Sequence, residues 1–141
     1  MISLKNVSLV FQGGSVAISN ISTEIKEGEF VYLVGHSGSG KSSFLKLLYK
    51  EHIATKGEIE VANIDVSKLP KWKIPILRRK IGIVTQEPQL LESRNTFENI
   101  AFALEVMGSL PEEIDAKTNT LLDLVELNEC AFKYPGQLSG G

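Results

Sequence analysis

The chain has 141 residues, which is enough for one domain with a hydrophobic core and too few to expect two. Hydrophobic residues make up 43% and charged residues 23%, as in soluble globular proteins, and a formal net charge of -2 argues against a general affinity for nucleic acid. No uncharged apolar run is long enough to cross a bilayer, and no signal-peptide pattern opens the chain. The one cysteine cannot form an internal disulfide. We therefore expect a cytoplasmic protein.

The first predicted elements are strands. Apolar and polar side chains alternate over residues 2–10 and again over residues 18–25, which predicts two half-exposed strands. Gly13 and Gly14 lie between them and predict a turn. The continuous apolar run over residues 30–34 is bounded by glycines and predicts a strand that is buried on both faces in a parallel sheet.

The next elements are a helix and two strands. Apolar side chains at helical spacing predict a helix over residues 42–50. Residues 57–61 predict another strand, and residues 81–85 predict a second buried one. Strands that alternate with helices after a β-rich opening indicate the α/β fold class, with an antiparallel β subdomain.

Two later helices have recognisable starts. Asn95 precedes Glu98 by three residues, and Ser109 precedes Glu112 by the same spacing, so both starts fit a capping box. The second helix carries an amphipathic stripe that is expected to pack on another element, formed by Ile114, Thr118, Leu121, Leu122 and Val125.

The stretch GHSGSGKS, residues 35–42, matches the pattern G-x-x-x-x-G-K-[ST] between a predicted strand and a predicted helix. Glycines let consecutive backbone N–H groups point inward, and the helix start adds the positive end of its dipole. Lys41 is expected to reach the β- and γ-phosphates of a nucleotide, and Ser42 to bind Mg2+. The alternative is a tight turn that is glycine-rich for conformational reasons alone. Such a turn does not require a lysine followed by a serine, so we favour the phosphate-binding interpretation. The predicted nucleotide-binding residues are Gly35, His36, Ser37, Gly38, Ser39, Gly40, Lys41, Ser42 and Ser43.

The chain has two histidines, His36 and His52. Neither has another histidine or a cysteine at metal-ligand spacing, so zinc is not expected. We interpret His36 as part of the loop and His52 as a surface residue.

Residues 68–80 form a basic stretch without any acidic residue. Its apolar members interleave with the charges as in an amphipathic helix, which favours a solvated face. Contact with an anionic membrane surface is the alternative. The six basic residues are Lys68, Lys71, Lys73, Arg78, Arg79 and Lys80.

Three further stretches decide among the classes of protein that carry such a phosphate-binding loop. Phe11 follows the first predicted strand, Gln86 ends another in VTQEPQLL, and the last residues read QLSGG. With GHSGSGKSS, in this order and spacing, they resemble an ABC-type ATPase over the whole chain. The resemblance implies a P-loop NTPase (RecA-like) core with an antiparallel β subdomain over residues 1–94. A helical subdomain over residues 95–141 follows, and the C-terminal half is incomplete.

The resemblance also implies a role for each matching residue. Phe11 would stack on adenine, although an aromatic residue at a strand end can also be a core residue. Gln86 would bind Mg2+ or the attacking water, and with Lys41 it would be catalytic; a solvated glutamine is the alternative. The last three residues would close over the γ-phosphate held by a second subunit, which implies a homodimer with two ATP molecules between its faces. These signature residues are Ser139, Gly140 and Gly141.

Residues 77–108 are similar to the FtsE-like, cell-division branch of this family, with departures at Thr85 and Glu87, and Phe11 stands where that branch more often has tyrosine. This similarity implies an ATP-binding subunit that couples ATP binding and hydrolysis to an integral membrane partner, FtsX-like, on the inner face of the cell membrane. A lipoprotein-release or macrolide-export subunit, or a non-catalytic docking fragment, are the alternatives. A P-loop kinase is disfavoured by QLSGG and Gln86.

The sequence given ends at the signature, before the family's Mg2+-binding aspartate, catalytic glutamate and switch histidine. We therefore expect the N-terminal part of a longer ATPase. Alone, it should bind nucleotide weakly and turn over ATP no faster than its Lys41→Ala variant, because the residue that polarises the attacking water is absent.

Overall fold

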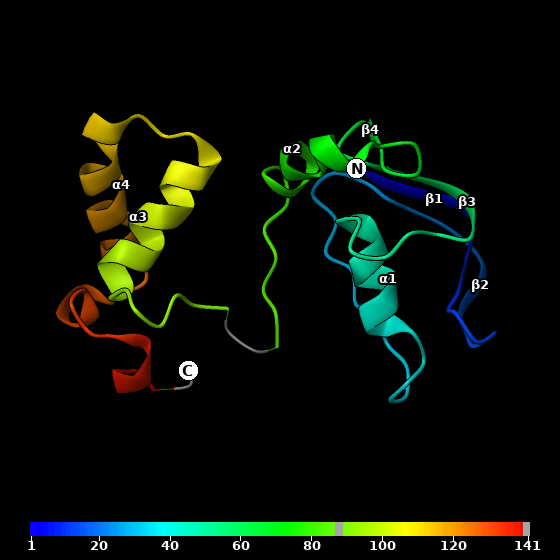
Figure 1. Ribbon diagram of the computed structural model, residues 1–141, viewed down its shortest axis with the longest axis horizontal. Helices are drawn as coiled ribbons and strands as arrows, with labels where there is room; N and C mark the ends of the chain where they lie inside the picture. Colours follow the sequence, from blue (N-terminus) through cyan, green and yellow to red (C-terminus); the bar gives the residue numbers. More distant parts are fainter. Residues whose placement is uncertain (87–88, 140–141) are drawn as a thin grey trace. The chain divides into compact units, whose positions relative to one another are not determined.

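The computed structural model describes residues 1–86 and 89–139, in two compact units, Met1–Gly82 and Ile83–Gly141. The first unit holds strands β1 (Ile2–Val10), β2 (Val16–Ile25), β3 (Lys56–Val61) and β4 (Ile64–Asp65), helices α1 (Lys41–Leu48) and α2 (Ile74–Arg78), and the 3-10 turn η1 (Lys71–Lys73) (Figure 1). The second unit holds helices α3 (Thr96–Met107) and α4 (Pro111–Leu124) and the 3-10 turns η2 (Asn128–Cys130) and η3 (Pro135–Gln137).

The first unit is built on an antiparallel sheet with the strand order β2-β1-β3-β4. Leu4 in the central strand β1 lies opposite Thr23 of β2 and Ile59 of β3. The predicted strands over residues 2–10, 18–25 and 57–61 are confirmed, as is the turn between the first two. The antiparallel β subdomain expected from the sequence is therefore present.

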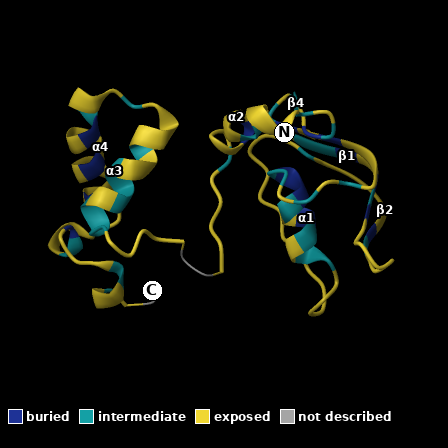
Figure 2. Ribbon diagram, in the orientation of Figure 1, coloured by how far each residue is buried: buried dark blue, intermediate teal, exposed yellow. Residues whose placement is uncertain are grey.

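One face of this sheet packs on α1. Each of the three long strands contributes buried side chains to this core, with a register shift in β1 between Leu4 and Val7. The helix contributes Phe44, Leu47 and Leu48, all buried (Figure 2). Burying a side chain of this size contributes roughly 1.5–3 kcal/mol, so the packing fixes the helix on the sheet. The buried core residues are Leu4, Val7, Leu9, Ile18, Phe44, Leu47, Leu48, Ile59, Val61, Val66 and Leu77.

The two predicted buried strands are wrong. Residues 30–34 form no strand, and Phe30, Tyr32 and Val34 are each about four-fifths exposed. Residues 81–85 form no strand either, and Val84 is fully exposed. A short apolar run becomes a buried strand only when neighbouring strands pair with it on both sides, and the strands described here pair with one another instead.

In the second unit, the predicted start of α3 is confirmed. The Asn95 side chain accepts a hydrogen bond from Glu98 N at 2.9 Å, and the Glu98 carboxylate accepts one from Asn95 N at 2.8 Å, which completes the capping box. Each helix leaves its first N–H groups without intrahelical partners, and this reciprocal pair satisfies two backbone donors.

The predicted capping box at Ser109 is wrong. Leu110 is the N-cap residue of α4, Pro111 opens the helix, and no side chain caps it. Ser109 instead belongs to the end of α3, where Gly108 is left-handed and Ser109 N donates to Leu104 O at 3.0 Å. The amphipathic stripe of α4 is buried at Ile114, Thr118 and Leu122, whereas Leu121 and Val125 are exposed.

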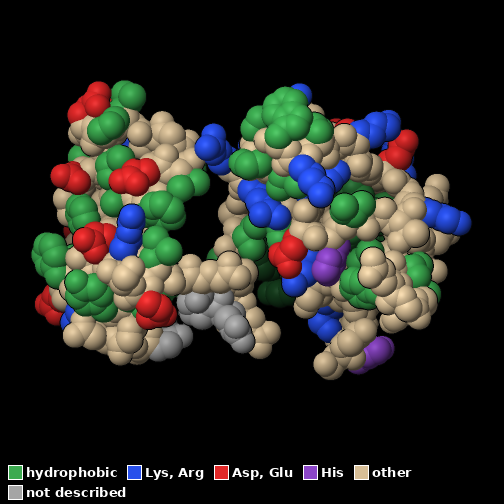
Figure 3. Space-filling model, in the orientation of Figure 1, with side chains coloured by type: hydrophobic (Ala, Val, Ile, Leu, Met, Phe, Trp, Pro, Cys, Tyr) green, Lys and Arg blue, Asp and Glu red, His purple; other side chains and the backbone are tan. Residues whose placement is uncertain are grey.

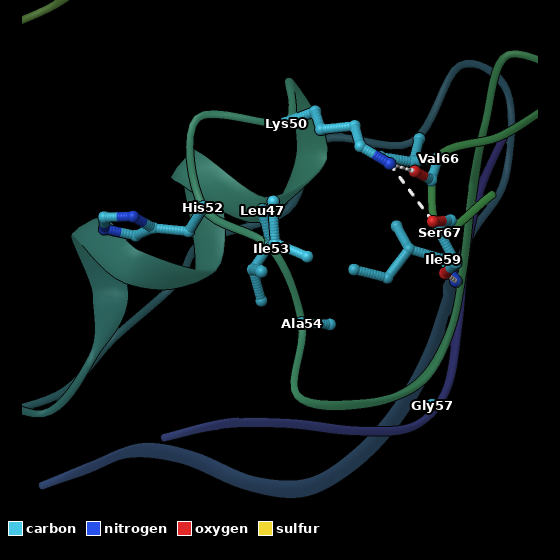
Figure 4. Close-up of a pocket in the computed structure, with 9 residues that line it drawn as sticks. All are labelled: Leu47, Lys50, His52, Ile53, Ala54, Gly57, Ile59, Val66 and Ser67. Atoms are coloured by element: carbon cyan, nitrogen blue, oxygen red, sulfur yellow. Dashed lines mark hydrogen bonds between the residues drawn. The ribbon is translucent and has the colours of Figure 1, made fainter. Parts of the chain in front are cut away.

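Lys50 ties the end of α1 to the segment that follows β4. Its Nζ donates to Val66 O, and to Ser67 O at 3.1 Å (Figure 4). The side chain lines a small cavity with Leu47, His52 and Ile59 among its walls. Burial lowers the pKa of Lys50 below its usual value. The ammonium group therefore donates hydrogen bonds to the Val66 and Ser67 carbonyls at the edge of the core.

We expect Lys50→Met to lower the free energy of unfolding by about 1–3 kcal/mol, because it keeps the aliphatic stem and leaves two partly buried carbonyls without their donor. Urea denaturation followed by circular dichroism measures the change. Lys46→Met is the matched control: its ion pair with Glu51 is exposed, so the loss should stay below about 1 kcal/mol. Equal losses in the two variants would contradict this role of Lys50.

Candidate nucleotide-binding site

The glycine-rich loop of residues 35–42 curls around the side chain of Lys41. This lysine opens α1, and its Nζ donates to Gly35 O at 2.8 Å and to His36 O at 2.7 Å. The Ser39 hydroxyl lies 3.5 Å from the same nitrogen. The ammonium group therefore sits inside the loop, where it is accessible to an anion that enters from solvent.

Gly40 allows the loop to lie against the sheet. It is the N-cap residue of α1, with a left-handed φ of 92°. A Cβ atom at this position would collide with the carbonyl oxygen of Ala17 in β2. Only glycine can adopt this backbone conformation and lie this close to β2. This explains why the sequence pattern has glycine at position 40.

The start of α1 offers free donors. The first backbone hydrogen bond of the helix joins Phe44 N to Gly40 O at 2.8 Å. Within residues 1–86 and 89–139, the N–H groups of Lys41, Ser42 and Ser43 donate to no acceptor, as expected in the first turn of a helix. Together with Lys41 they form a cradle of the kind that binds phosphate.

The same cradle fits a Mg2+ ion that accompanies a phosphate. The Ser42 side chain is exposed, and its hydroxyl makes no hydrogen bond within the part of the chain that the structure describes. It is therefore available as an oxygen ligand beside bound phosphate oxygens. In the described ranges, no group of three or more histidine, cysteine, aspartate or glutamate side chains is arranged to hold a metal ion. A Mg2+ ion at Ser42 would therefore need phosphate oxygens as further ligands.

Phe11 lies just after β1, and the residue is 39% exposed. A short turn holds it: Phe11 N donates to Ser15 O at 2.8 Å, and Gly14 N donates to Phe11 O at 3.0 Å. Its ring meets the ring of His52 edge-on, with the centroids 5.3 Å apart. Part of the Phe11 ring is therefore free to stack on a flat ligand.

His52 is the residue that sequence reasoning missed. The sequence predicts a surface residue, yet His52 is partly buried and its ring contacts Phe11. Its backbone N–H donates to Lys46 O at 3.1 Å, just after α1. The contact joins residues 41 positions apart in the sequence, so no local pattern could have revealed it.

The remaining predicted site residues belong to the second unit. Gln86 lies exposed in a bend, and Ser139 lies exposed just after η3. Gly140 and Gly141 lie outside the described residues. Among the described helices, none is both long and apolar enough to span a bilayer.

A glycine-rich loop that places a lysine at the first position of a helix, beside free amide donors, is the arrangement typical of P-loop proteins. The chain belongs to the ABC transporter family, whose sequence pattern matches residues 18–141. The resemblance to ABC-type ATPases noted from the sequence is thereby confirmed.

Individual relatives agree with this assignment. The chain is 46% identical over its whole length to the cell division ATP-binding protein FtsE of Bacillus subtilis and 38% identical to that of Streptococcus pneumoniae. It is 40% identical to the methionine import ATP-binding protein MetN of Francisella tularensis. It spans 62%, 61% and 41% of the lengths of these three proteins. The predicted similarity to the FtsE-like branch is confirmed.

Solved structures confirm the α/β fold class of an ABC cassette. One is the ATP-binding cassette MJ0796 as a dimer in a post-hydrolysis state, bound to ADP and Pi. It aligns with a TM-score of 0.88 at 35% identity, over 99% of this chain and 64% of that one. A second dimeric structure of MJ0796, a bacterial ABC transporter cassette, also aligns with a TM-score of 0.88, at 36% identity.

Proposed function

We propose that this chain is the ATP-binding part of an FtsE-like subunit, which couples ATP binding and hydrolysis to an integral membrane partner in cell division. The observation that carries the proposal is the cradle around Lys41, with its ammonium group 2.8 and 2.7 Å from two loop carbonyls and three free amides beside it. The relatives named cell division ATP-binding proteins support the biological context.

Each residue of the site has a defined task in this proposal. Lys41 exchanges the carbonyls of Gly35 and His36 for the β- and γ-phosphate oxygens, and the α1 amides bind the same phosphates. Phe11 stacks on adenine. The Ser42 hydroxyl and the Gln86 side chain hold Mg2+, which neutralises charge on the phosphates. Gln86 also orients the water that attacks the γ-phosphate.

The proposal extends to partners. Ser139, Gly140 and Gly141 would contact the γ-phosphate bound by a second copy, which gives a homodimer with ATP between its faces. The dimeric state of the solved MJ0796 structures supports this arrangement. The membrane partner would be FtsX-like, and it would hold the subunit on the inner face of the cell membrane. Residues 1–94 would carry the phosphate loop, and residues 95–141 the helical subdomain.

Calorimetry tests the central claim. Titration with MgATP, with inorganic tripolyphosphate plus Mg2+, and with AMP should give binding to the first two ligands and no measurable binding to AMP. In the proposal, Lys41 and the free amides at the start of α1 bind the triphosphate tail, which AMP lacks. Absence of binding for both MgATP and tripolyphosphate would overturn the proposed function.

Phe11→Ala separates recognition of the base from recognition of the phosphates. Its affinity for MgATP should fall by roughly fivefold to a hundredfold, the equivalent of about 1–3 kcal/mol of lost stacking. Its affinity for tripolyphosphate should not change. The matched control is Phe132→Ala, which truncates an exposed phenylalanine of the second unit. A Phe11→Ala variant that binds MgATP as the parent chain does would exclude the stacking role.

A further inference from the structure

The basic segment, residues 68–80, is a structured surface that the nucleotide site does not use. It comprises η1 and α2, and all six of its basic side chains are exposed. The segment carries six positive charges and no negative one, in a chain whose formal net charge is -2. Positive charge is therefore concentrated in one short stretch of the sequence of the first unit. Figure 3 shows lysine and arginine side chains at several places on one face of this unit.

Leu77 anchors this segment to the core, because its side chain is completely buried. Trp72 and Ile76 are 72% and 47% exposed. The segment thus has a buried apolar side that fixes it to the sheet, and a second set of apolar side chains that faces solvent among the cations. A large exposed aromatic side chain beside lysines is costly in water and typical of an interaction surface.

Some of these cations already have partners. Arg78 Nε donates to Tyr49 O at 3.1 Å, Lys68 pairs with Asp65 at 3.4 Å, and Lys73 Nζ lies 4.8 Å from the centre of the Trp72 ring. The side chains of Lys71, Arg79 and Lys80 have no such partner in residues 1–86 and 89–139. These three cations are available to an external anionic surface.

We propose that the basic segment binds directly to an anionic lipid bilayer, with Trp72 and Ile76 at the level of the headgroups and Lys71, Arg79 and Lys80 against lipid phosphates. Tryptophan favours this interfacial layer, because its ring is apolar and its N–H polar, and lysine stems can lie along the apolar region with their charges in water. Each cation near such a surface adds about fivefold in affinity.

The apolar member Ile76 favours a bilayer over a nucleic acid as the occupant. A single-stranded nucleic acid would need flat side chains for successive bases to stack on, and Trp72 is the only aromatic residue in the segment. A bilayer accepts aliphatic and aromatic side chains equally. The inference shares with the proposed function only the expectation that the protein works at a membrane, and it does not depend on nucleotide binding.

The test uses the fluorescence of Trp72, which is the only tryptophan of the chain. The 141-residue chain is mixed with vesicles of phosphatidylcholine alone, or of phosphatidylcholine and phosphatidylserine in roughly equal amounts. We expect co-sedimentation and a blue shift of the emission with the anionic vesicles only, and weaker binding as salt is added. Absence of binding, equal binding to both vesicles, or binding without a blue shift would overturn the proposal.

Variants locate the surface. The triple variant Lys71→Gln, Arg79→Gln and Lys80→Gln should bind anionic vesicles roughly a hundredfold more weakly. The matched control, Lys5→Gln, Lys26→Gln and Lys56→Gln, removes the same charge from exposed positions elsewhere in the first unit and should lose much less. An equal loss in both variants would show that only net charge matters and would overturn the proposal.

Two further arms distinguish this inference from its alternatives. Lys41→Ala changes the nucleotide loop and leaves the basic segment intact, so it should bind vesicles as the parent chain does. Failure of the lipid proposal and failure of the proposed nucleotide site can therefore be told apart. A single-stranded oligonucleotide should not displace the anionic vesicles. Displacement accompanied by quenching of Trp72 would overturn the lipid assignment in favour of a nucleic acid.

Discussion

Lys41→Ala is expected to weaken MgATP binding by roughly a hundredfold or more. The ammonium group makes two hydrogen bonds to loop carbonyls, at 2.8 and 2.7 Å, which shows that it reaches across the whole phosphate loop. In the proposed complex with MgATP, charged hydrogen bonds to phosphate oxygens would replace these two, each contributing about 1.5–3 kcal/mol. Calorimetry with MgATP and with tripolyphosphate measures the change, and both affinities should fall together.

Lys26→Ala is the control for this experiment. It removes an exposed lysine of the first unit whose side chain takes part in none of the ion pairs described above, and it should leave both affinities unchanged. Thermal denaturation of the two variants should be similar, because the hydrogen bonds of the Lys41 side chain in the described part of the chain all lie within its own loop. An unchanged MgATP affinity in Lys41→Ala would refute the assignment of residues 35–42 as the triphosphate site.

Gly40→Ala is expected to cost about 2–5 kcal/mol of the free energy of unfolding and to abolish measurable MgATP binding. The added methyl group would collide with the Ala17 carbonyl, and a left-handed alanine costs a further 1–2 kcal/mol or so. The loop and the start of α1 must then move away from β2, which separates the amides from Lys41. Urea denaturation and calorimetry measure the two effects.

Gly38→Ala provides the matched comparison. Gly38 is also left-handed, with a φ of 78°, but among the described residues no atom outside its own neighbours lies within 4 Å of its hypothetical Cβ. It should therefore lose only about 1–2 kcal/mol, the cost of the backbone conformation. If the two alanine variants were equally stable, the close approach of Gly40 to β2 would not be what shapes the site.

The phosphate loop could be predicted from the sequence because its requirements are local. Glycine where the backbone is left-handed, lysine at the helix start and a hydroxyl after it all lie within eight residues. The capping box at Asn95 succeeded for the same reason. The capping box predicted at Ser109 is wrong because only three residues, 108–110, separate α3 from α4. Gly108 ends α3 in a left-handed conformation, Ser109 belongs to that helix end, and Leu110 is the N-cap residue of α4.

Features that depend on distant partners could not be predicted. Residues 30–34 have the composition of a buried strand, but composition does not state which strand will pair with them. The contact between Phe11 and His52 has no sequence signature, since it forms only when the segment after α1 returns to the end of β1. Sequence patterns thus predicted the local conformation of residues 35–42 better than the surroundings of Phe11.

The exposed apolar stretch of residues 30–34 has a practical consequence for anyone who handles this chain. Its side chains favour extended structure, and it contains neither a proline nor a charge. In a concentrated preparation, such a stretch is a starting point for intermolecular β-sheet and precipitation. A charged substitution such as Tyr32→Lys should raise the concentration at which turbidity begins, and it would touch none of the groups that cradle phosphate.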